Sequence, residues 1–227
     1  MELVIGYWQI SIQRVYPTTE QLIRMYNTAA PYWRRHLQWL GYSRAYTELF
    51  QSLQHSGVLA HLQDRSTVCD CGIGTAAFSL ALAQTVTARL DITGIDISLE
   101  MLGQAHQLLE RAGVNHQLCQ SDVNAIPYSD RTFDLVMSAH MLEHLPDPLT
   151  GLREMVRVLQ PGAPLILAVT RRGLLGSLIQ LHWGNDCLQP KVLLEMMTDT
   201  GLTNIHFYPF TFGLSHWTSI ACVGFKN

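Results

Sequence analysis

The residues best suited to chemistry begin in the stretch 68–77, an apolar segment that ends in an aspartate and two closely spaced glycines. Gly72 and Gly74 permit backbone angles and a close approach that a Cβ atom would block. A helix that begins at Thr75 would point unpaired N–H groups and the positive end of its dipole at the same place. Such an arrangement is typical of a site for a cofactor that contains a nucleoside, so an adenosine-bearing ligand is the first to consider.

Two further acids follow predicted strands in the same way. The pattern Gly72-x-Gly74-x-x-Ala77 alone also fits the dinucleotide fingerprint, in which a helix start binds a pyrophosphate. An aspartate at position 70 argues against that ligand, because a carboxylate would repel a pyrophosphate. The predicted strand 90–96 ends in Asp96, and the predicted strand 114–120 runs into Asp122. Since ligands of open parallel sheets bind at the carboxyl ends of the strands, we expect the three acids along one rim.

Four blocks, taken in order, resemble the class I S-adenosylmethionine-dependent methyltransferases. Within them the chain is similar to the small-molecule group typified by the ubiquinone and menaquinone biosynthesis enzymes. The resemblance covers roughly residues 66–227, and one departure is Ala76, which stands where the family usually has a third glycine. The blocks are Asp70-x-Gly72-x-Gly74, Gly94-Ile95-Asp96-Ile97-Ser98 with Glu100-Met101-Leu102, Ser121-Asp122, and Leu142-Glu143-His144-Leu145-Pro146-Asp147-Pro148.

The resemblance implies S-adenosyl-L-methionine as the cofactor and gives each acid a part of it. This cofactor carries no phosphate, so an acid before the glycine turn is useful: Asp70 would hold the methionine ammonium, directly or through water. Asp96 would accept both ribose hydroxyls. Asp122 would accept the adenine amino group while the Val123 amide contacts the ring. The other expected cofactor-binding residues are Gly72, Gly74, Ile97, Met101 and Ala139.

Methyl transfer from a sulfonium is an in-line displacement, which requires alignment, exclusion of water and, for some acceptors, removal of a proton. His140 leaves the predicted strand 133–138 where the donated methyl group should lie, so it is the candidate general base. The alternative is that His140 only lines the cofactor site. Half of the aromatic residues lie within the first 50 positions, which suits a flat or apolar acceptor. The expected acceptor-binding residues are Tyr26, Trp33, His182, His216 and Trp217.

Three other functions compete with this interpretation. The string His140-Met141-Leu142-Glu143-His144 is the inverted zinc-peptidase signature H-x-x-E-H. Zinc needs both histidines on one helix face and a third ligand, whereas Pro146 leaves little room for a helix, so no metal is expected. A cyclase of the same fold would bind S-adenosylmethionine without transferring its methyl group. An NAD-linked reductase would bind nicotinamide instead.

The elements that must position these residues alternate between strand and helix after residue 66. This alternation predicts an α/β protein with a parallel sheet and helices on both faces. The predicted strands 203–210 and 218–225 are joined too briefly for a crossover, so the last strand must run antiparallel to its neighbour. The resembling family has that reversed strand in a Rossmann-like seven-stranded sheet of order 3-2-1-4-5-7-6, which is the expected fold together with an N-terminal helical cap.

The expected cap or lid comprises residues 1–65, before the S-adenosylmethionine-binding methyltransferase domain of residues 66–227. Thr18 and Gln21 have the spacing of a capping box, and an amphipathic stripe follows until Pro31. A second helix is predicted from about Ser43 to Gly57. Because ligands lie beyond the carboxyl ends of the strands, these helices are expected to roof the acceptor pocket.

Composition narrows the class of protein further. The 227 residues, 48% of them hydrophobic, suffice for a full core, and a formal net charge of -3 argues against a nucleic-acid partner. Five cysteines without a Cys-x-x-Cys pair indicate a reducing compartment, and we expect Cys69 and Cys71 to point to opposite faces of their strand. We expect no membrane-spanning segment, because no apolar run reaches the length of a bilayer, and no signal peptide, because the N-terminus lacks a cationic start followed by an apolar core. The expected partner is a small-molecule acceptor in the cytoplasm; a homodimer is compatible with these features.

Overall fold

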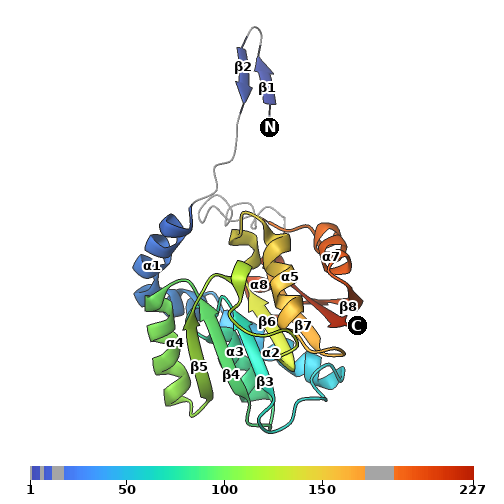
Figure 1. The fold of residues 1–227 in the computed structure, drawn as a ribbon. Helices are drawn as coiled ribbons and strands as arrows, with labels where there is room; N and C mark the ends of the chain where they lie inside the picture. The colour runs from blue at the N-terminus through green and yellow to red at the C-terminus, as the bar shows by residue number, and fades with distance from the viewer. Residues whose placement is uncertain (1, 6–7, 12–17, 172–186) are drawn as a thin grey trace.

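The computed structural model of the chain describes residues 2–5, 8–11, 18–171 and 187–227 (Figure 1). Seven strands form one sheet with the spatial order β5-β4-β3-β6-β7-β9-β8. The strands are β3 (Thr67–Cys71), β4 (Asp91–Asp96), β5 (Asn115–Gln120), β6 (Leu135–Ala139), β7 (Pro164–Thr170), β8 (Leu202–Pro209) and β9 (Ser219–Lys226). The helices are α1 (Thr19–Trp39), α2 (Tyr42–His55), α3 (Ala77–Thr85), α4 (Leu99–Arg111), α5 (Pro148–Val158), α7 (Pro190–Asp199) and α8 (Ser215–Thr218), with the 3-10 turns η1 (Val123–Ala125) and η2 (Leu142–His144).

The topology confirms the predicted Rossmann-like α/β fold. Strands β3 to β7 pair in parallel, whereas β9 is antiparallel to both of its neighbours, β7 and β8. Counted from β3, the strand order is 3-2-1-4-5-7-6, with the last strand reversed. The parallel arrangement brings the carboxyl ends of β3, β4, β5 and β6 to one edge, where the predicted site residues lie.

Hydrophobic residues pack on both faces of the sheet, which Figure 1 shows between two layers of helices. Alternation along each strand sends side chains to opposite faces, as Val68 and Cys69 illustrate by belonging to different core clusters. On one face the core includes Phe50 of α2 and Phe78 of α3, and on the other it includes Met155 of α5. This double cover leaves the two ends of the strands as the places where polar groups can meet a ligand.

The N-terminal segment divides into parts with different roles in packing. Six residues of α2 are buried and share a core with the sheet, so α2 belongs to the central layers. Helix α1 is less buried, and its start shows the expected capping box, in which Thr18 N and Gln21 N donate to each other's side chains at 2.8 and 3.3 Å. Strands β1 (Glu2–Ile5) and β2 (Trp8–Ser11) form an antiparallel hairpin, which the helical interpretation of residues 1–65 did not include. The division of function at residue 65 stays a prediction.

Two expectations about local structure were wrong. Helix α1 does not end at Pro31 but continues to Trp39. Pro31 is exposed, and on an exposed helix face water can hydrate the carbonyl that a proline leaves unpaired. Cys69 and Cys71 lie on the same face of β3, with their Sγ atoms 3.7 Å apart, because residues two apart on a strand share a face. Both thiols are free.

Candidate functional site

The loop between β3 and α3 contains two glycines with different neighbours. Gly72 and Gly74 have φ values of 73° and 52°, in the left-handed region that favours glycine. Gly72 N and Ile73 N both donate to Ile95 O, at 2.8 and 3.0 Å, and so tie the loop to β4. A Cβ atom on Gly72 would lie 2.4 Å from Met141 Cγ, whereas one on Gly74 would meet nothing within 4 Å. The open space that a ligand could use is therefore beside Gly74.

Thr75 follows this open position and is a residue that the sequence analysis treated only as a helix start. Its side chain is 2% exposed, and its Oγ1 has no hydrogen-bond partner among the described residues. A buried hydroxyl left without a partner costs about 1–3 kcal/mol, so a ligand oxygen that accepted its proton would stabilise it. A hydroxyl immediately after the second glycine was the signal that could have identified it.

Asp96 ends β4 and is held by two backbone groups. Its Oδ2 accepts Gly74 N and its Oδ1 accepts Ser98 N, both at 2.9 Å. Burial raises its pKa, while the hydrogen bonds from Ser98 and Gly74 oppose that shift. Each carboxylate oxygen keeps a further lone pair, so the side chain can still accept hydroxyl protons from a ligand.

Asp70 lies deeper, at 1% exposure, next to the end of β3. Ser79 Oγ of α3 donates to its Oδ2 at 2.6 Å. Burial raises the pKa of Asp70 to about 7, the Ser79 hydrogen bond opposes the shift, and the charge of Asp96 adds to it. A cation such as an ammonium would favour the charged form of this carboxyl.

The third acid, Asp122, follows β5 and is half-buried. Its Oδ1 accepts Asn124 N at 2.8 Å and so caps η1. Val123 and Met101, which were also expected to bind the cofactor, are 4% and 1% exposed. Because β5, β4 and β3 are parallel neighbours, the three acids lie along one edge of the sheet. The remaining residues expected to bind cofactor, Ile97 and Ala139, are half-buried at the ends of β4 and β6.

His140 follows β6 with a left-handed backbone, at φ 54°. Such a conformation costs a non-glycine residue about 1–3 kcal/mol and persists where the surroundings enforce it. Its backbone N–H donates to Ala168 O at 2.7 Å, which fixes the residue to β7. Its Nδ1 lies 3.3 Å from Glu143 Oε1 and 3.2 Å from Thr170 Oγ1. Its Nε2 is buried and has no partner in the part of the chain that the structure describes.

Glu143 is wholly buried beside this histidine. Its Oε1 also accepts Thr170 N at 2.8 Å, while its Oε2 has no partner within the described ranges. Burial alone would raise the pKa of Glu143, but the His140 hydrogen bond and the neighbouring His140 and His144 rings hold it below its ordinary value. The sequence analysis placed Glu143 only in a family block and in the zinc string. An acid three residues after the candidate base was the available signal.

Aromatic rings from α2 surround His140. The Tyr42 ring meets the imidazole edge-on, with centroids 5.3 Å apart, and the Tyr46 ring lies at 6.4 Å. Tyr42 Oη lies 3.2 Å from Thr218 Oγ1 of α8. Both tyrosines are buried, so α2 forms an apolar wall next to the unpaired nitrogen. The sequence analysis had included both rings only in the general count of aromatics.

Helix α1 reaches the same region from another side. Tyr26 packs edge-on against Trp33 and His144, with centroids 6.0 and 5.7 Å apart. Burial raises the pKa of Tyr26 well above its ordinary value, and the charges of Asp96 and Glu143 add to the shift. On the next residue, Asn27 Oδ1 accepts Ser98 Oγ at 2.6 Å. Tyr26 therefore lies near Asp96 at the end of β4 and near η2, and Trp33 packs against it.

The structure describes two of the three remaining residues expected to bind the acceptor. His216 and Trp217 lie on α8 with exposed side chains, and their rings are 4.8 Å apart. His216 Nδ1 is 2.8 Å from Phe210 O. His182 lies outside the described residues.

The H-x-x-E-H string has no helix to present it. His140 lies at a strand end, and residues 142–144 form only the turn η2. Over residues 18–171 and 187–227 and the hairpin strands, no group of three or more His, Cys, Asp or Glu side chains is arranged to hold a metal ion.

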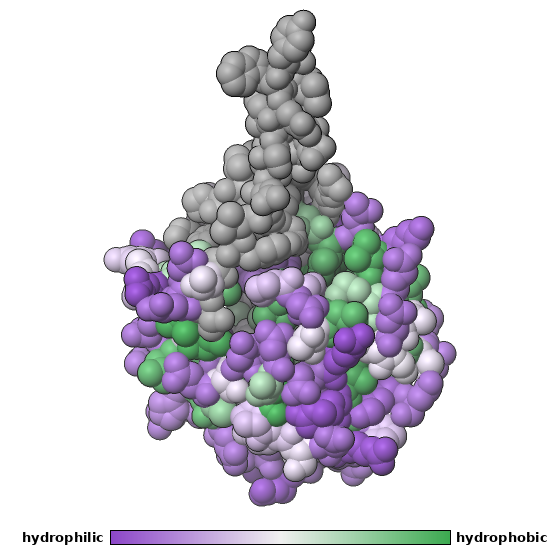
Figure 2. Space-filling view, turned by 45° about the horizontal axis from the view of Figure 1, so that its top comes forward, coloured by the Kyte–Doolittle hydropathy of each residue, from purple (hydrophilic) through white to green (hydrophobic). Residues whose placement is uncertain are grey.

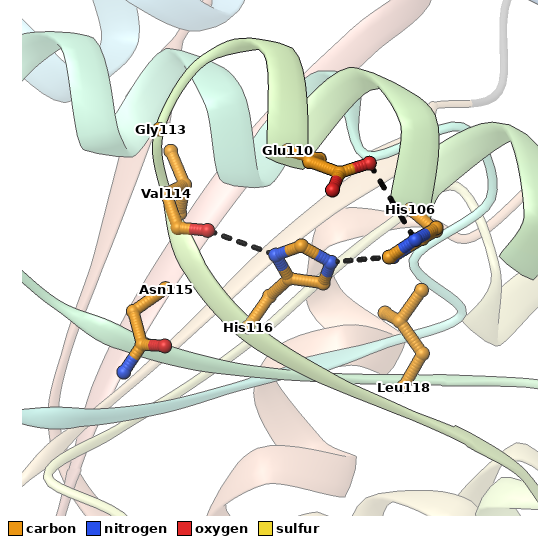
Figure 3. A pocket seen from close by; sticks show the side chains of 7 residues that line it. All are labelled: His106, Glu110, Gly113, Val114, Asn115, His116 and Leu118. Atoms are coloured by element: carbon orange, nitrogen blue, oxygen red, sulfur yellow. Dashed lines mark hydrogen bonds and ion pairs between the residues drawn. The ribbon is translucent and has the colours of Figure 1, made fainter.

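A separate pocket lies at the amino end of β5, away from the carboxyl edge (Figure 3). His106 Nδ1 and His116 Nε2 are 2.8 Å apart, and His116 Nδ1 is 2.8 Å from Val114 O. His106 Nε2 lies 3.7 Å from Glu110 Oε2. These side chains point toward one another. Because the pocket lies at the opposite end of β5 from Asp122, it is not part of the candidate site.

Comparison with known proteins identifies the family of this chain. A family model described as a methyltransferase domain matches residues 69–167. Demethylmenaquinone methyltransferase of Lactiplantibacillus plantarum is 30% identical over 67% of this chain and 77% of its own. The enzyme of the same name from Geobacillus sp. is 28% identical over 92% of this chain and 96% of its own.

Solved structures share the fold at lower identity. Magnesium protoporphyrin IX methyltransferase (ChlM) from Synechocystis PCC 6803, solved with bound SAH, has a TM-score of 0.73 at 18% identity, covering 92% of this chain and 99% of that one. The [4+2]-cyclase SpnF also has a TM-score of 0.73 at 18% identity, covering 93% and 97%. These likenesses show the fold alone, and the sequence relatives decide between the two reactions. The chain belongs to the class I S-adenosylmethionine-dependent methyltransferases and resembles the quinone-biosynthesis enzymes among them.

Proposed function

We propose that this S-adenosylmethionine-dependent enzyme methylates an apolar aromatic acceptor of the demethylmenaquinone type. Its relatives are named for that acceptor. The observation that carries the proposal is His140 Nε2, a buried nitrogen that finds no partner among the described residues and lies beside the rings of Tyr42 and Tyr46. An apolar wall with one unpaired base suits an aromatic compound that gives up a proton. The acceptor atom, O, N or C, is left open.

The same proposal assigns roles to the three acids at the carboxyl edge of the sheet, Asp70, Asp96 and Asp122, which are called the donor rim below. Asp70 would hold the methionine ammonium and Asp96 the ribose hydroxyls. Asp122 and the Val123 amide would bind the adenine. Gly72, Gly74, Ile97, Met101 and Ala139 would line the cofactor. When bound, the cofactor supplies a methyl group on a positively charged sulfur.

Two features of the glycine loop fit this cofactor. The space beside Gly74 is open, and the Thr75 hydroxyl is buried without a partner in the described chain. The cofactor's carboxylate is a strong acceptor for such a hydroxyl, so Thr75 is added to the proposed cofactor-binding residues. Asp70, Asp96 and Asp122 together supply the negative charge that a cationic ligand requires.

On the acceptor side, Tyr26 and Trp33 of α1 would cover the acceptor, as part of the cap formed by residues 1–65. His182, His216 and Trp217 stay proposed acceptor-binding residues. On the face shown in Figure 2, apolar patches interrupt a mainly hydrophilic surface, which suits the approach of an apolar compound. Among the residues that the structure describes, the exposed large apolar side chains are Tyr32 and Trp39 of α1, Leu99 of α4, Val192 and Leu194 of α7, and Trp217 of α8.

The proposal also includes the cellular location, the oligomeric state and the partners of the enzyme. None of the helices in the described part of the chain is both long and apolar enough to cross a membrane. We propose a cytoplasmic enzyme that acts on a small molecule, forms a homodimer and has no nucleic-acid partner. The net charge of -3 supports the last point. Sedimentation of the purified protein tests the oligomeric state.

The central experiment incubates purified protein with methyl-labelled S-adenosylmethionine and a short-chain demethylmenaquinol. Label is expected in the quinol, with an equal amount of S-adenosylhomocysteine. His140→Ala is expected to lower turnover roughly 100-fold or more, as general-base loss does, while calorimetry shows cofactor affinity within about twofold. Transfer to other aromatic compounds but not to the quinol would contradict the acceptor type. Full activity of His140→Ala across pH would contradict its role as base, and cofactor binding without any S-adenosylhomocysteine would favour the cyclase alternative.

A further inference from the structure

The hydrogen bonds around His140 determine which ring nitrogen carries its proton. Glu143 Oε1 lies 3.3 Å from Nδ1 and also accepts Thr170 N at 2.8 Å. An ionised carboxylate only accepts hydrogen bonds, so Nδ1 must be the donor of this pair. In the neutral ring Nε2 then carries the lone pair. This is the nitrogen that is buried without a partner among the described residues.

The charge on Glu143 is maintained inside the protein. The side chain is 1% exposed, and burial without partners would favour the neutral acid. The hydrogen bond and charge of His140, together with His144, instead hold the pKa of Glu143 below its ordinary value. The Glu143 carboxylate and the Nδ1–H group of His140 therefore stabilise each other. The long distance of 3.3 Å does not argue against this, because catalytic hydrogen bonds are often long before substrate binds.

The geometry leaves the imidazole little freedom to turn. The left-handed backbone of His140 and its 2.7 Å bond to Ala168 O fix the Cα position. Glu143 reaches back from η2, three residues along the chain, to the same nitrogen that faces Thr170 Oγ1 on β7. Tyr42 closes one side of the ring edge-on. With Nδ1 held by two side chains, Nε2 has one direction in which to act.

We propose that Glu143 is the positioning residue of this enzyme, which holds His140 with its proton on Nδ1 and leaves Nε2 free as the base. The inference rests on the proposed role of His140. During transfer an N–H bond forms at Nε2 as the acceptor loses its proton. The electron pair left on the acceptor bonds to the methyl carbon, and the electrons of the broken carbon–sulfur bond neutralise the sulfonium. The unchanged carboxylate of Glu143 stabilises the positive ring that results.

Other titratable groups lie around this pair. Tyr42 and Tyr46 face His140 from α2, and burial raises the pKa of Tyr46 well above its ordinary value, so its phenol stays neutral. The groups that act electrostatically on the pair or on its neighbours are His144 on η2, Tyr26 on α1 and Asp70 on β3.

The test is Glu143→Gln, which keeps the size and an amide oxygen that can accept Nδ1–H and Thr170 N–H but removes the charge. We expect kcat to fall about 10-fold and the acidic limb of the pH–rate profile to move about one unit toward lower pH, with the KM for the cofactor unchanged. Glu154→Gln is the matched control, because Glu154 Oε2 also accepts a backbone N–H, that of Ile126 at 2.9 Å, but on α5. Its acidic limb should coincide with that of the wild type.

A second measurement does not depend on enzyme activity, and its main result comes from the wild-type protein. Nitrogen-15 NMR of wild-type protein should show the neutral His140 ring protonated at Nδ1, and Glu143→Gln should show a mixture of the two forms. An Nε2-protonated ring in the wild type, or identical acidic limbs in Glu143→Gln and wild type, would overturn the proposal. An acidic limb that survives in His140→Ala would instead remove the proposed base, and the NMR result would still decide the role of Glu143.

Discussion

The carboxylates of the donor rim and the His140–Glu143 pair on the acceptor side differ in how far the chain satisfies their polar atoms. Each rim carboxylate already has a partner within the chain, whereas on the acceptor side two buried atoms, His140 Nε2 and Glu143 Oε2, have none among the described residues. The rim partners are Ser79 for Asp70, Gly74 and Ser98 for Asp96, and Asn124 for Asp122. The two halves of one pocket are therefore prepared for different tasks.

This difference predicts which residues determine the affinity for the cofactor and which determine turnover. Groups that are held in place before a ligand arrives lose little freedom on binding, so the rim favours affinity for the cofactor. A buried atom without a partner costs about 1–3 kcal/mol, and that cost is compensated only if a ligand or the reaction uses the atom. Changes on the rim should thus act on cofactor binding, and changes at His140 or Glu143 should act on kcat.

The largest effect is expected from Asp96→Ala. This change removes two hydrogen bonds from a buried carboxylate to the backbone, at Gly74 N and Ser98 N, as well as the proposed ribose contact. Charged hydrogen bonds contribute about 1.5–3 kcal/mol each, so cofactor affinity should fall roughly 100-fold or more. Calorimetric titration with S-adenosylhomocysteine measures the loss. An unchanged affinity would break the comparison, because the rim would then not determine binding.

A control on the same strand separates this effect from general destabilisation. Asp91 begins β4, at the end away from the rim, where its Oδ1 accepts Asn115 Nδ2 at 2.6 Å and its Oδ2 lies 3.4 Å from Arg65 Nη2. Asp91→Ala also removes a carboxylate with local partners. Its affinity for the cofactor should stay within about twofold of the wild type, since exposed pairs contribute little.

Much of the fold could be predicted, because local signals and the global order agree. Serine and aspartate are preferred at helix starts, and at the start of α4 Ser98 Oγ accepts Met101 N at 3.1 Å. Asp147 likewise caps α5 through Leu149 N at 3.2 Å. The hairpin of residues 2–11 escaped prediction because four-residue strands are too short to show a clear period of two. The continuation of α1 through Pro31 depends on exposure, which the sequence does not specify.

Site residues could be predicted only where their place at the end of a strand was sufficient to locate them. The three rim acids follow strand ends, so the parallel sheet places them without further information. Glu143 and Thr75 depend on burial and on the absence of partners, which only tertiary structure supplies. The same holds for Gly72, whose missing Cβ makes room for Met141.

A smaller, pH-dependent effect is expected at Asp70. Only the ionised carboxylate can hold an ammonium, and burial raises its pKa to about 7, so wild-type affinity should increase about tenfold from pH 6 to pH 8. Asp70→Asn should bind the cofactor more weakly, with affinity independent of pH. A wild-type affinity that does not change with pH would remove Asp70 from the rim.

Although Asp70→Asn should bind the cofactor more weakly, its folded state should be more stable than that of the wild type at high pH. The folded pKa of about 7 lies above the ordinary value of 3.8, so folding favours the protonated acid, and the stability it contributes at low pH is lost as pH rises through about 4 to 7. Asparagine has no charge to bury. Asp70→Asn should therefore melt at a higher temperature than wild type at pH 8, with a smaller difference at pH 5, as thermal denaturation followed by circular dichroism would show.

The smallest effect is expected from Ala76→Gly, which restores the glycine usual in the family. Ala76 has φ 61°, a left-handed conformation that costs alanine about 1 kcal/mol relative to glycine. Its methyl group is wholly buried, and its loss costs about 0.8 kcal/mol, so stability should change by less than about 0.5 kcal/mol. Ala76→Val is the contrasting variant and should destabilise by about 1–3 kcal/mol, because a branched side chain fits neither the backbone nor the space. Cofactor affinity measured by calorimetry should be unchanged in Ala76→Gly. Weaker binding would mean that strain at Ala76 is released when the cofactor binds, and the rim would then not be formed in advance.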